Sequence, residues 1–330
     1  MRLDNFIQTA MNNVLKNPIL SILRDINFSS ILKQSNFINR DIGKSPYLVI
    51  LHFLYMFVIN RKISSFMKYS NDSYKKDVYY KLLKSSKYNW RKLLLLTSVK
   101  LICKLHKLQN TTDTKVLIID DTVEIKIGKF IEGSCKNLWS NKEHRTVKGL
   151  NIVSLNYSDC YTDMMLDFLL TTTMHKTLGR VKIVFIKTKD NLIPIISTNT
   201  NLSDIEIINT YKKRWNIEQG YKDLREYFQF GKEENRIYEA IIARITLSFL
   251  AYNLTSYINR VQNEPQTLGN LFRDLECQLE TLAISMELFL KILEQIIESQ
   301  EIVKRNKDLE QIIHMLRVYT KKQLGFMCES

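Results

Sequence analysis

Val116-Leu-Ile-Ile-Asp-Asp-Thr122 is the point at which the pattern of this chain changes from helix to strand. Its four apolar residues form a short, continuous run rich in β-branched side chains. Such a run is typical of a strand buried on both faces, and hence near the centre of a sheet covered by helices. The run ends in two aspartates. We therefore expect Asp120 at the end of a central strand, with Asp121 beside it.

Four more strands are predicted after this one. The alternating stretch 122–127 is the next strand, and Asn151–Leu155 is the third. Val181–Ile186 and Leu192–Ser197 follow as a hairpin, and Pro194 marks the second of these as an edge strand because proline cannot donate to a ladder.

Helical patterns lie on both sides of the strands. Residues 1–110 show apolar positions at three- and four-residue spacing without alternation, which predicts an all-helical region. Ile237–Ile258 is apolar on most sides, which marks a buried core helix. The amphipathic helices over 267–322 either dock on the core or pair with a second subunit in a homodimer. The predicted fold class is α+β, a mixed sheet flanked by helices, with a helical domain at 1–110, a core at 111–258 that carries an inserted β-hairpin near 180–198, and a helical C-terminal region at 259–330.

The chain is strongly basic, with a formal net charge of +14 over 330 residues. This charge predicts attraction to a polyanion, nucleic acid first and an anionic membrane surface second. The apolar run 47–59 is shorter than the ~20 residues that a bilayer requires, so no membrane partner is expected. The five cysteines are scattered and odd in number, which argues against a zinc site or a disulfide framework and favours a reducing cytosol.

Much of the positive charge lies in one segment. Residues 61–110 contain 13 Lys and Arg but only two acids, Asp72 and Asp77. Lysines there alternate with tyrosines and a tryptophan, which suits a helix lying along a phosphate backbone with the aromatic rings packed beneath it. The alternative is the lysine-rich surface of a helical bundle. The candidate DNA-binding residues are Lys75, Lys76, Lys81, Lys84, Lys87, Arg91 and Lys92.

A polar cluster follows on a helix that is predicted to begin at Ser203, an N-cap with Glu206 three residues on. At about 100° per residue, five side chains fall within an arc of roughly 80°: Tyr211, Arg214, Glu218, Lys222 and Arg225. This set suits a divalent metal held by Glu218 and phosphates held by the cations. The alternative is a solvated helix face with ion pairs such as Glu218–Lys222.

Asp120 and Glu218 together predict a metal site. Carboxylates from a strand end and from a later helix are an arrangement that binds two divalent ions for an in-line phosphodiester displacement. Carboxylate oxygens are natural ligands of Mg²⁺. The two residues are 98 positions apart, which leaves room for further strands between them.

Together these elements resemble the DDE transposases of bacterial insertion sequences, and more narrowly the group with a Tyr-x2-Arg-x3-Glu-x6-Lys signature. Tyr211, Arg214 and Glu218 match that signature in type and spacing, whereas Arg225 stands where the signature usually has lysine. The block around Asp120 is similar to the family's first-aspartate block.

The resemblance implies an RNase H-like core, Mg²⁺ or Mn²⁺ as cofactor, and a reaction that nicks transposon ends and joins the 3′ hydroxyl to target DNA. It implies double-stranded DNA, both transposon ends and target, as the partner, and the bacterial cytoplasm and nucleoid as the location. In this resemblance Asp120 and Glu218 are the catalytic and metal-binding residues. The supporting residues are Asp121, Tyr211, Arg214, Lys222 and Arg225.

One part of the family pattern is missing. The family has a second aspartate at the end of a fourth core strand, which is reached through a helix. Here Ser158–Gly179 spans only 22 residues and contains no apolar strand that ends in aspartate. We therefore expect an internally deleted copy with impaired catalysis. The alternatives are a non-catalytic repressor that occupies transposon ends, and an unrelated basic structural or RNA-binding protein.

Overall fold

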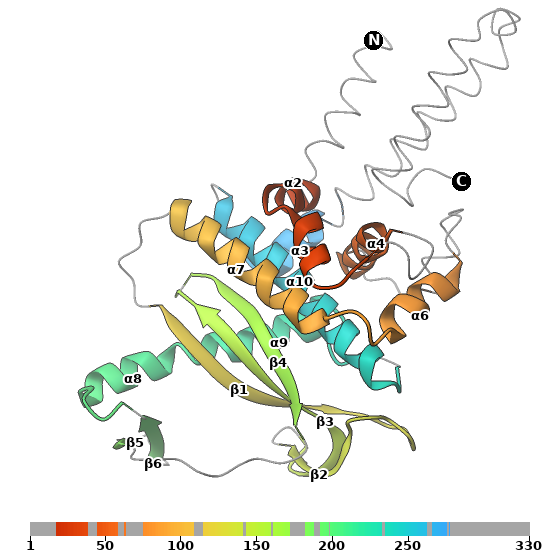
Figure 1. Ribbon diagram of the computed structural model, residues 1–330. Helices are drawn as coiled ribbons and strands as arrows, with labels where there is room; N and C mark the ends of the chain where they lie inside the picture. The colour runs from red at the N-terminus through yellow and green to blue at the C-terminus, as the bar shows by residue number, and fades with distance from the viewer. Residues whose placement is uncertain are drawn as a thin grey trace, which may run out of the picture.

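The structure is a computed structural model, shown in Figure 1. It describes residues 18–38, 45–58, 63, 75–108, 115–140, 143–159, 161–171, 182–187, 192–197, 199–232, 235–262, 266–275 and 277. In chain order the elements are α2 (Pro18–Asp25), α3 (Phe28–Gln34), α4 (Pro46–Val58), α6 (Lys76–Lys84), α7 (Trp90–Leu108), β1 (Val116–Ile125), β2 (Cys135–Ser140), β3 (Arg145–Ser158), β4 (Asp163–Thr171), β5 (Lys182–Lys187), β6 (Leu192–Ser197), α8 (Asp204–Lys212), α9 (Trp215–Tyr227) and α10 (Tyr238–Val261).

The main sheet is antiparallel, and β3 lies in its middle. Strand β1 pairs with β3 along its whole length, with Asp120 opposite Ser154. Strands β4 and β2 pair with the other edge of β3, and a register shift interrupts the β3–β4 ladder beside Leu155. Strands β5 and β6 form a separate two-stranded sheet, which a small apolar cluster joins to α8.

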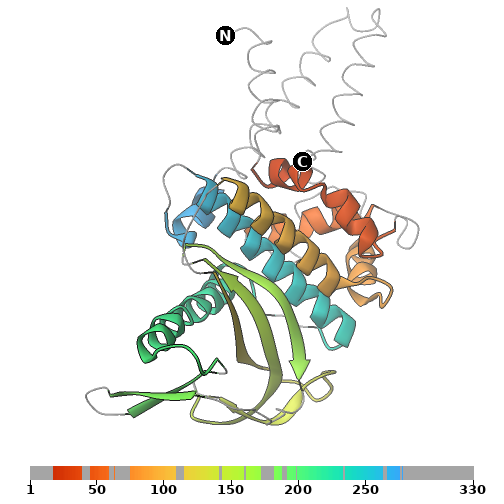
Figure 2. The ribbon, with the colours of Figure 1, turned by 60° about the vertical axis from the view of Figure 1, so that its left-hand side comes forward.

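Helices α7 and α10 lie side by side and pack against strand β4 of the main sheet (Figure 2). Helix α10 is apolar on all sides because it is surrounded. It packs against α2, α4, α6, α7 and β4. Its length and composition would let it cross a bilayer, but 94% of its most apolar window is buried inside the protein, as in a core helix. A single cluster of buried side chains extends from Ile19 to Leu275.

A buried amide fastens the two central helices to the sheet. The side chain of Asn253 on α10 accepts the Met165 N–H at 2.9 Å and donates to the Met165 carbonyl at 2.7 Å. It also donates to the Ser98 hydroxyl of α7 at 2.8 Å. These bonds satisfy the backbone of β4 where its ladder with β3 is irregular.

Replacing Asn253 by alanine is expected to lower the free energy of unfolding by about 2–4 kcal/mol. The reason is that the buried N–H of Met165 would lose its side-chain partner, and its carbonyl would keep only the Ser98 hydroxyl. Urea unfolding followed by circular dichroism measures the change. The exposed Asn137→Ala variant is the control and should stay within about 0.5 kcal/mol of the parent. Equal stability of the two variants would contradict the role assigned to Asn253.

Several sequence expectations are confirmed. The chain is a mixture of helices and an antiparallel sheet. The predicted core helix corresponds to α10, and the predicted hairpin strands correspond to β5 and β6. Ser203 and Glu206 form a complete capping box at the start of α8. The turn predicted between β5 and β6 and most of 267–322 lie outside the described residues.

The prediction for the first strand is wrong in two respects. Residues 116–119 and 122–125 belong to one strand, because Asp120 and Asp121 continue the ladder with β3. That strand is not buried on both faces. Among the described strands β1 pairs only with β3, and Leu117 and Ile119 are 65% and 71% exposed. The apolar run that predicted a central strand therefore lies at a sheet edge with one face open.

Other differences concern segments without a clear pattern. Strand β4 was not predicted, although it does not end in aspartate and so leaves the missing-strand expectation unchanged. The predicted single helix is divided at Lys213 and Arg214, which keep helical dihedral angles between α8 and α9. The boundary near residue 110 stays a prediction, because the helices before it share the core with the sheet.

Candidate functional site

Helix α9 lies beside β1, against the face of the sheet to which the alternate residues Asp120, Thr122 and Glu124 point. The phenol of Tyr221 on α9 is 2.7 Å from the Ser154 hydroxyl on β3, directly opposite Asp120 in the ladder. Burial raises the pKa of Tyr221, so this phenol stays protonated and serves as a fixed hydrogen-bonding group. The helix is thereby held against β3, next to the position of Asp120 on β1.

A single guanidinium joins the two predicted catalytic carboxylates. Arg214 approaches both oxygens of Asp120 at 3.5 Å and donates to Oε1 of Glu218. The ring of Tyr211 packs against this guanidinium, with its centroid 5.3 Å away. The structure therefore brings Asp120 and Glu218 to the same side of the sheet, within the span of one arginine head group.

The environment of Asp120 disfavours its charge. Burial raises the pKa of this carboxyl, and the positive charge of Arg214 acts in the opposite direction. The Glu218 carboxylate adds to the upward shift because it is a nearby like charge. A cation between the two carboxylates stabilises their charged forms, and in this structure Arg214 supplies it.

Arg225 makes the second link between α9 and β1. Its guanidinium donates to Glu124 at 2.8 Å and to the Thr122 hydroxyl at 2.6 Å. The planar fork of arginine reaches both groups at once, which the single ammonium of lysine would not. The sequence did not single out Glu124, although its spacing of four from Asp120 on a strand places it on the same face.

Two predicted supporting residues lie elsewhere. Asp121 is exposed on the opposite, open face of the sheet, because neighbouring residues of a strand alternate. Lys222 is exposed and lines a cleft on the other side of α9. The predicted arc of five side chains is thus divided: Tyr211, Arg214 and Glu218 surround the site, Arg225 lies farther along β1, and Lys222 faces away.

The carboxylate pair fits one divalent cation, with water completing its coordination, since Mg²⁺ prefers oxygen ligands and keeps several waters. An ion bound to both Asp120 and Glu218 would take the place of the Arg214 guanidinium. Within the described part of the chain, no group of three or more His, Cys, Asp and Glu side chains is placed to hold a metal. The donor set therefore suits one ion and falls short of two.

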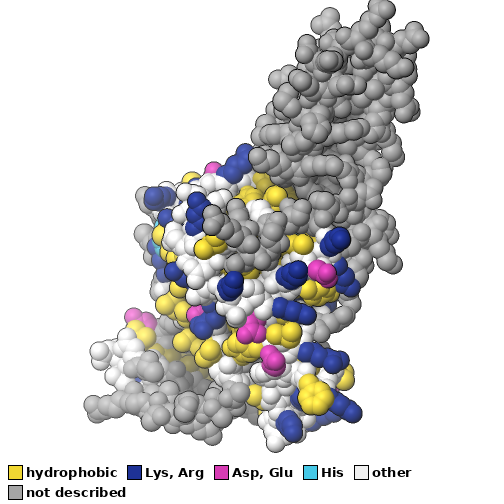
Figure 3. Space-filling view, turned by 45° about the vertical axis from the view of Figure 1, so that its right-hand side comes forward, with side chains coloured by type: hydrophobic (Ala, Val, Ile, Leu, Met, Phe, Trp, Pro, Cys, Tyr) yellow, Lys and Arg dark blue, Asp and Glu magenta, His cyan; other side chains and the backbone are white. Residues whose placement is uncertain are grey.

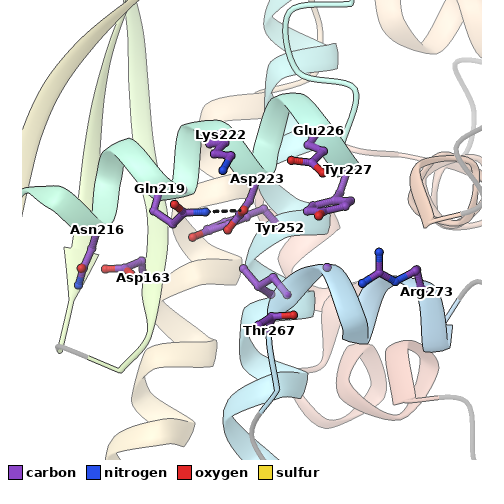
Figure 4. Close-up of a pocket in the computed structure, with 13 residues that line it drawn as sticks. Asp163, Asn216, Gln219, Lys222, Asp223, Glu226, Tyr227, Tyr252, Thr267 and Arg273 are labelled. Carbon is purple, nitrogen blue, oxygen red and sulfur yellow. Dashed lines mark hydrogen bonds between the residues drawn. The ribbon is translucent and has the colours of Figure 1, made fainter.

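The cleft on the other side of α9 has a volume of about 530 Å³ and lies between α9, α10 and the helical segment after residue 266 (Figure 4). Asp163, at the start of β4, lies at one end of it beside Asn216. Burial raises the pKa of the Asp163 carboxyl to about 6. One of its oxygens is buried without a hydrogen-bond partner. No sequence pattern indicated this cleft, because its residues come from four separate segments.

The Asp163→Asn variant should be more stable than the parent at neutral pH. The pKa of Asp163 is higher in the folded protein than in the unfolded chain, so the folded state binds more protons between about pH 4 and 6. The stability contributed by this group is therefore present below about pH 4 and is lost as pH rises through 6. The difference between the two pKa values corresponds to about 3 kcal/mol at most. Urea unfolding from pH 4.5 to 8 measures the change.

The control for that measurement is Asp77→Asn, which removes an exposed carboxylate on α6. Its stability difference from the parent should stay nearly constant over the same pH range. A flat difference for Asp163→Asn would show that the carboxyl titrates normally in the folded protein.

Six of the seven candidate DNA-binding residues are exposed on α6, beside it or at the start of α7: Lys75, Lys76, Lys81, Lys84, Lys87 and Lys92. The ring of Tyr80 lies between the ammonium groups of Lys76 and Lys84, at 5.6 and 5.8 Å. Basic side chains are spread over the face seen in Figure 3. The seventh, Arg91, is partly buried. It forms a bidentate pair with Asp167, at 2.8 and 2.6 Å, which links α7 to β4.

A family described as transposase DDE domain matches residues 89–254, about half of the chain. The matched segment begins next to α7, includes β1 and α9, and ends within α10. No curated protein matches the chain, and no solved structure matches it either.

Proposed function

The chain belongs to the transposase DDE domain family, and on this premise we propose that it is a DNA-binding protein of transposase descent whose catalytic centre is impaired. The observation that carries the proposal is the meeting of Asp120 and Glu218 at one guanidinium, with no third metal-binding group beside them among the described residues. We propose that it binds duplex DNA in the bacterial cytoplasm, at transposon ends and target sites.

In this proposal Asp120 and Glu218 would hold a single divalent ion, Mg²⁺ or Mn²⁺, which when bound would supply charge stabilisation to a phosphodiester oxygen beside them. Arg214, once displaced from the carboxylates, is positioned to hold a DNA phosphate, since guanidinium groups bind phosphate with paired hydrogen bonds. Tyr211 stacks on Arg214 and limits where that head group moves.

The open edge of β1 supports the proposal that a segment with the fourth core strand has been deleted from this copy. An RNase H-like core would carry a fourth strand beside β1 and helices over the face on which Leu117 and Ile119 lie. In this chain those side chains are exposed and β1 has no second partner among the described strands. The same deletion favours the alternative of a repressor that occupies transposon ends. Such a repressor would need the surface that binds DNA but not a working catalytic centre.

DNA binding is expected to depend on the lysines of α6. The triple variant Lys76→Ala/Lys81→Ala/Lys84→Ala should bind duplex DNA at least tenfold more weakly at low salt. The slope of log K against log salt should become shallower by about 0.9 for each phosphate that the variant no longer neutralises. Fluorescence anisotropy with a labelled duplex measures both quantities.

A matched control removes the same charge elsewhere. Lys33, Lys100 and Lys107 are exposed on α3 and α7, and their triple alanine variant should keep the parent slope. Equal weakening by both triple variants would mean that net charge alone, and no surface on α6, determines binding.

Strand transfer by the parent chain is expected to be undetectable. Two carboxylates leave one ion of a two-ion mechanism without ligands. The assay uses transposon-end duplexes with Mg²⁺ or Mn²⁺, at protein concentrations that saturate DNA binding. Joined products that appear with the parent and disappear with Glu218→Ala would overturn the impaired-catalysis proposal, while binding without products supports it.

A further inference from the structure

The β2–β3 hairpin extends beyond the helices that cover the sheet (Figure 1). Trp139 lies on this hairpin, directly opposite Thr146, and is 58% exposed. Residues two apart on a strand share a face, so Trp139, Thr146 and Lys148 point to the same side. Ser154, which pairs with Asp120, is on that side too. The indole therefore lies on the face of the sheet that carries the carboxylate pair.

The loop between β1 and β2 is fastened to the same face. The Lys148 ammonium donates to the carbonyls of Gly128 and Lys129, the latter at 3.1 Å. Farther along, Glu132 accepts the Tyr238 N–H at 2.6 Å, at the start of α10. A loop held at both ends keeps its conformation, and it presents Phe130 with 79% of its surface exposed.

Ile127 in this loop is fully exposed. Single exposed apolar residues are ordinary on protein surfaces. Here a tryptophan and a phenylalanine stand on one fastened loop and its neighbouring hairpin, which is a pair that burial or stability does not explain. We name the surface of Phe130, Trp139 and Lys148 the hairpin platform.

The charge around the hairpin platform indicates its partner. Residues 126–148 contain six Lys and Arg against two Glu. One of the six, Lys126, is buried and donates to the Gly231 carbonyl at 2.8 Å, so it does not belong to the surface charge. Arg145 lies 3.8 Å from one of these acids, Glu143, and both side chains remain well exposed. Exposed aromatic rings set among cations match the chemistry of a DNA strand with unpaired bases, in which the rings stack on bases and the cations follow the phosphates. A protein partner with an apolar patch would gain nothing from the surplus of positive charge.

We propose that the hairpin platform binds unpaired bases of a DNA strand that passes the Asp120–Glu218 pair. The proposal rests on the proposed DNA-binding function and adds to it a ligand class and a site. Thr146 is eight residues from Ser154 along β3, which corresponds to at most about 26 Å at about 3.3 Å per residue. A strand held on the hairpin platform thus reaches the carboxylates within several nucleotides.

The test compares a short labelled single strand with the matching blunt duplex, by fluorescence anisotropy on the full chain. Trp139→Ala is expected to weaken binding of the single strand about tenfold, and Phe130→Ala to weaken it by a similar factor, since each removes one stacking surface. Trp139→Phe keeps an aromatic ring and should recover most of the affinity. Binding of the duplex, which depends on α6, should change less than twofold.

Phe185→Ala is the matched control, because Phe185 is an exposed aromatic residue on β5, away from the hairpin. It should leave both affinities unchanged. Thermal unfolding of each variant within 2–3 °C of the parent, which corresponds to a small stability change for a chain of this size, establishes that a weakened affinity is a local effect.

The outcomes separate the two proposals. Duplex binding by the parent, with single-strand binding unaffected by Trp139→Ala, would overturn the hairpin platform and leave the proposed function standing. No duplex binding by the parent would overturn the proposed function itself. A parallel measurement uses vesicles containing anionic phosphatidylserine. Loss of vesicle binding in Trp139→Ala, with both DNA affinities unchanged, would reassign the surface to a membrane and overturn the proposal.

Discussion

Two guanidinium groups between α9 and β1 hold the site together. Asp120 and Glu124 on the strand and Glu218 on the helix place three carboxylates along one contact, which would separate the two elements if it held no positive charge. Arg214 joins Asp120 to Glu218, and Arg225 holds Glu124. Partly buried carboxylates are tolerated only when they are paired in this way. The position of every other side chain in the site follows from that contact.

Much of the site could be predicted because it depends on periodicity. A period of 3.6 places Arg214 and Glu218 on one side of a helix, and an apolar run places Asp120 on a strand. What the sequence could not show is how the strand is covered, since Leu117 and Ile119 are equally apolar at the centre of a sheet and at its edge. Lys222 was misplaced for a related reason. The helical period predicts which side chains share a side of α9 but not what that side meets, and Lys222 lines the cleft instead of the carboxylate pair.

Strand β4 and the cleft at Asp163 lay beyond prediction for a different reason. The run Asp163–Thr171 contains apolar residues on both faces and a register shift, so it shows neither alternation nor a turn signal. The cleft is made by tertiary packing of segments that are far apart in the chain.

The open edge of β1 carries a charged residue that opposes aggregation through strand pairing, and this residue can be read from the sequence. Asp121 is exposed on the open face of β1, and a charge in that position discourages pairing with another chain.

Helix α10 fixes the distance between the lysines of α6 and the carboxylate pair. It contacts α6, β4 and α9, so the lysine surface and the carboxylate pair are attached to one packed core. A duplex held on α6, as proposed, would meet Asp120 at a separation fixed by side-chain packing. The protein would then present to Asp120 a phosphate that lies a fixed number of base pairs from the duplex held on α6. A copy that no longer cuts DNA would keep this spacing.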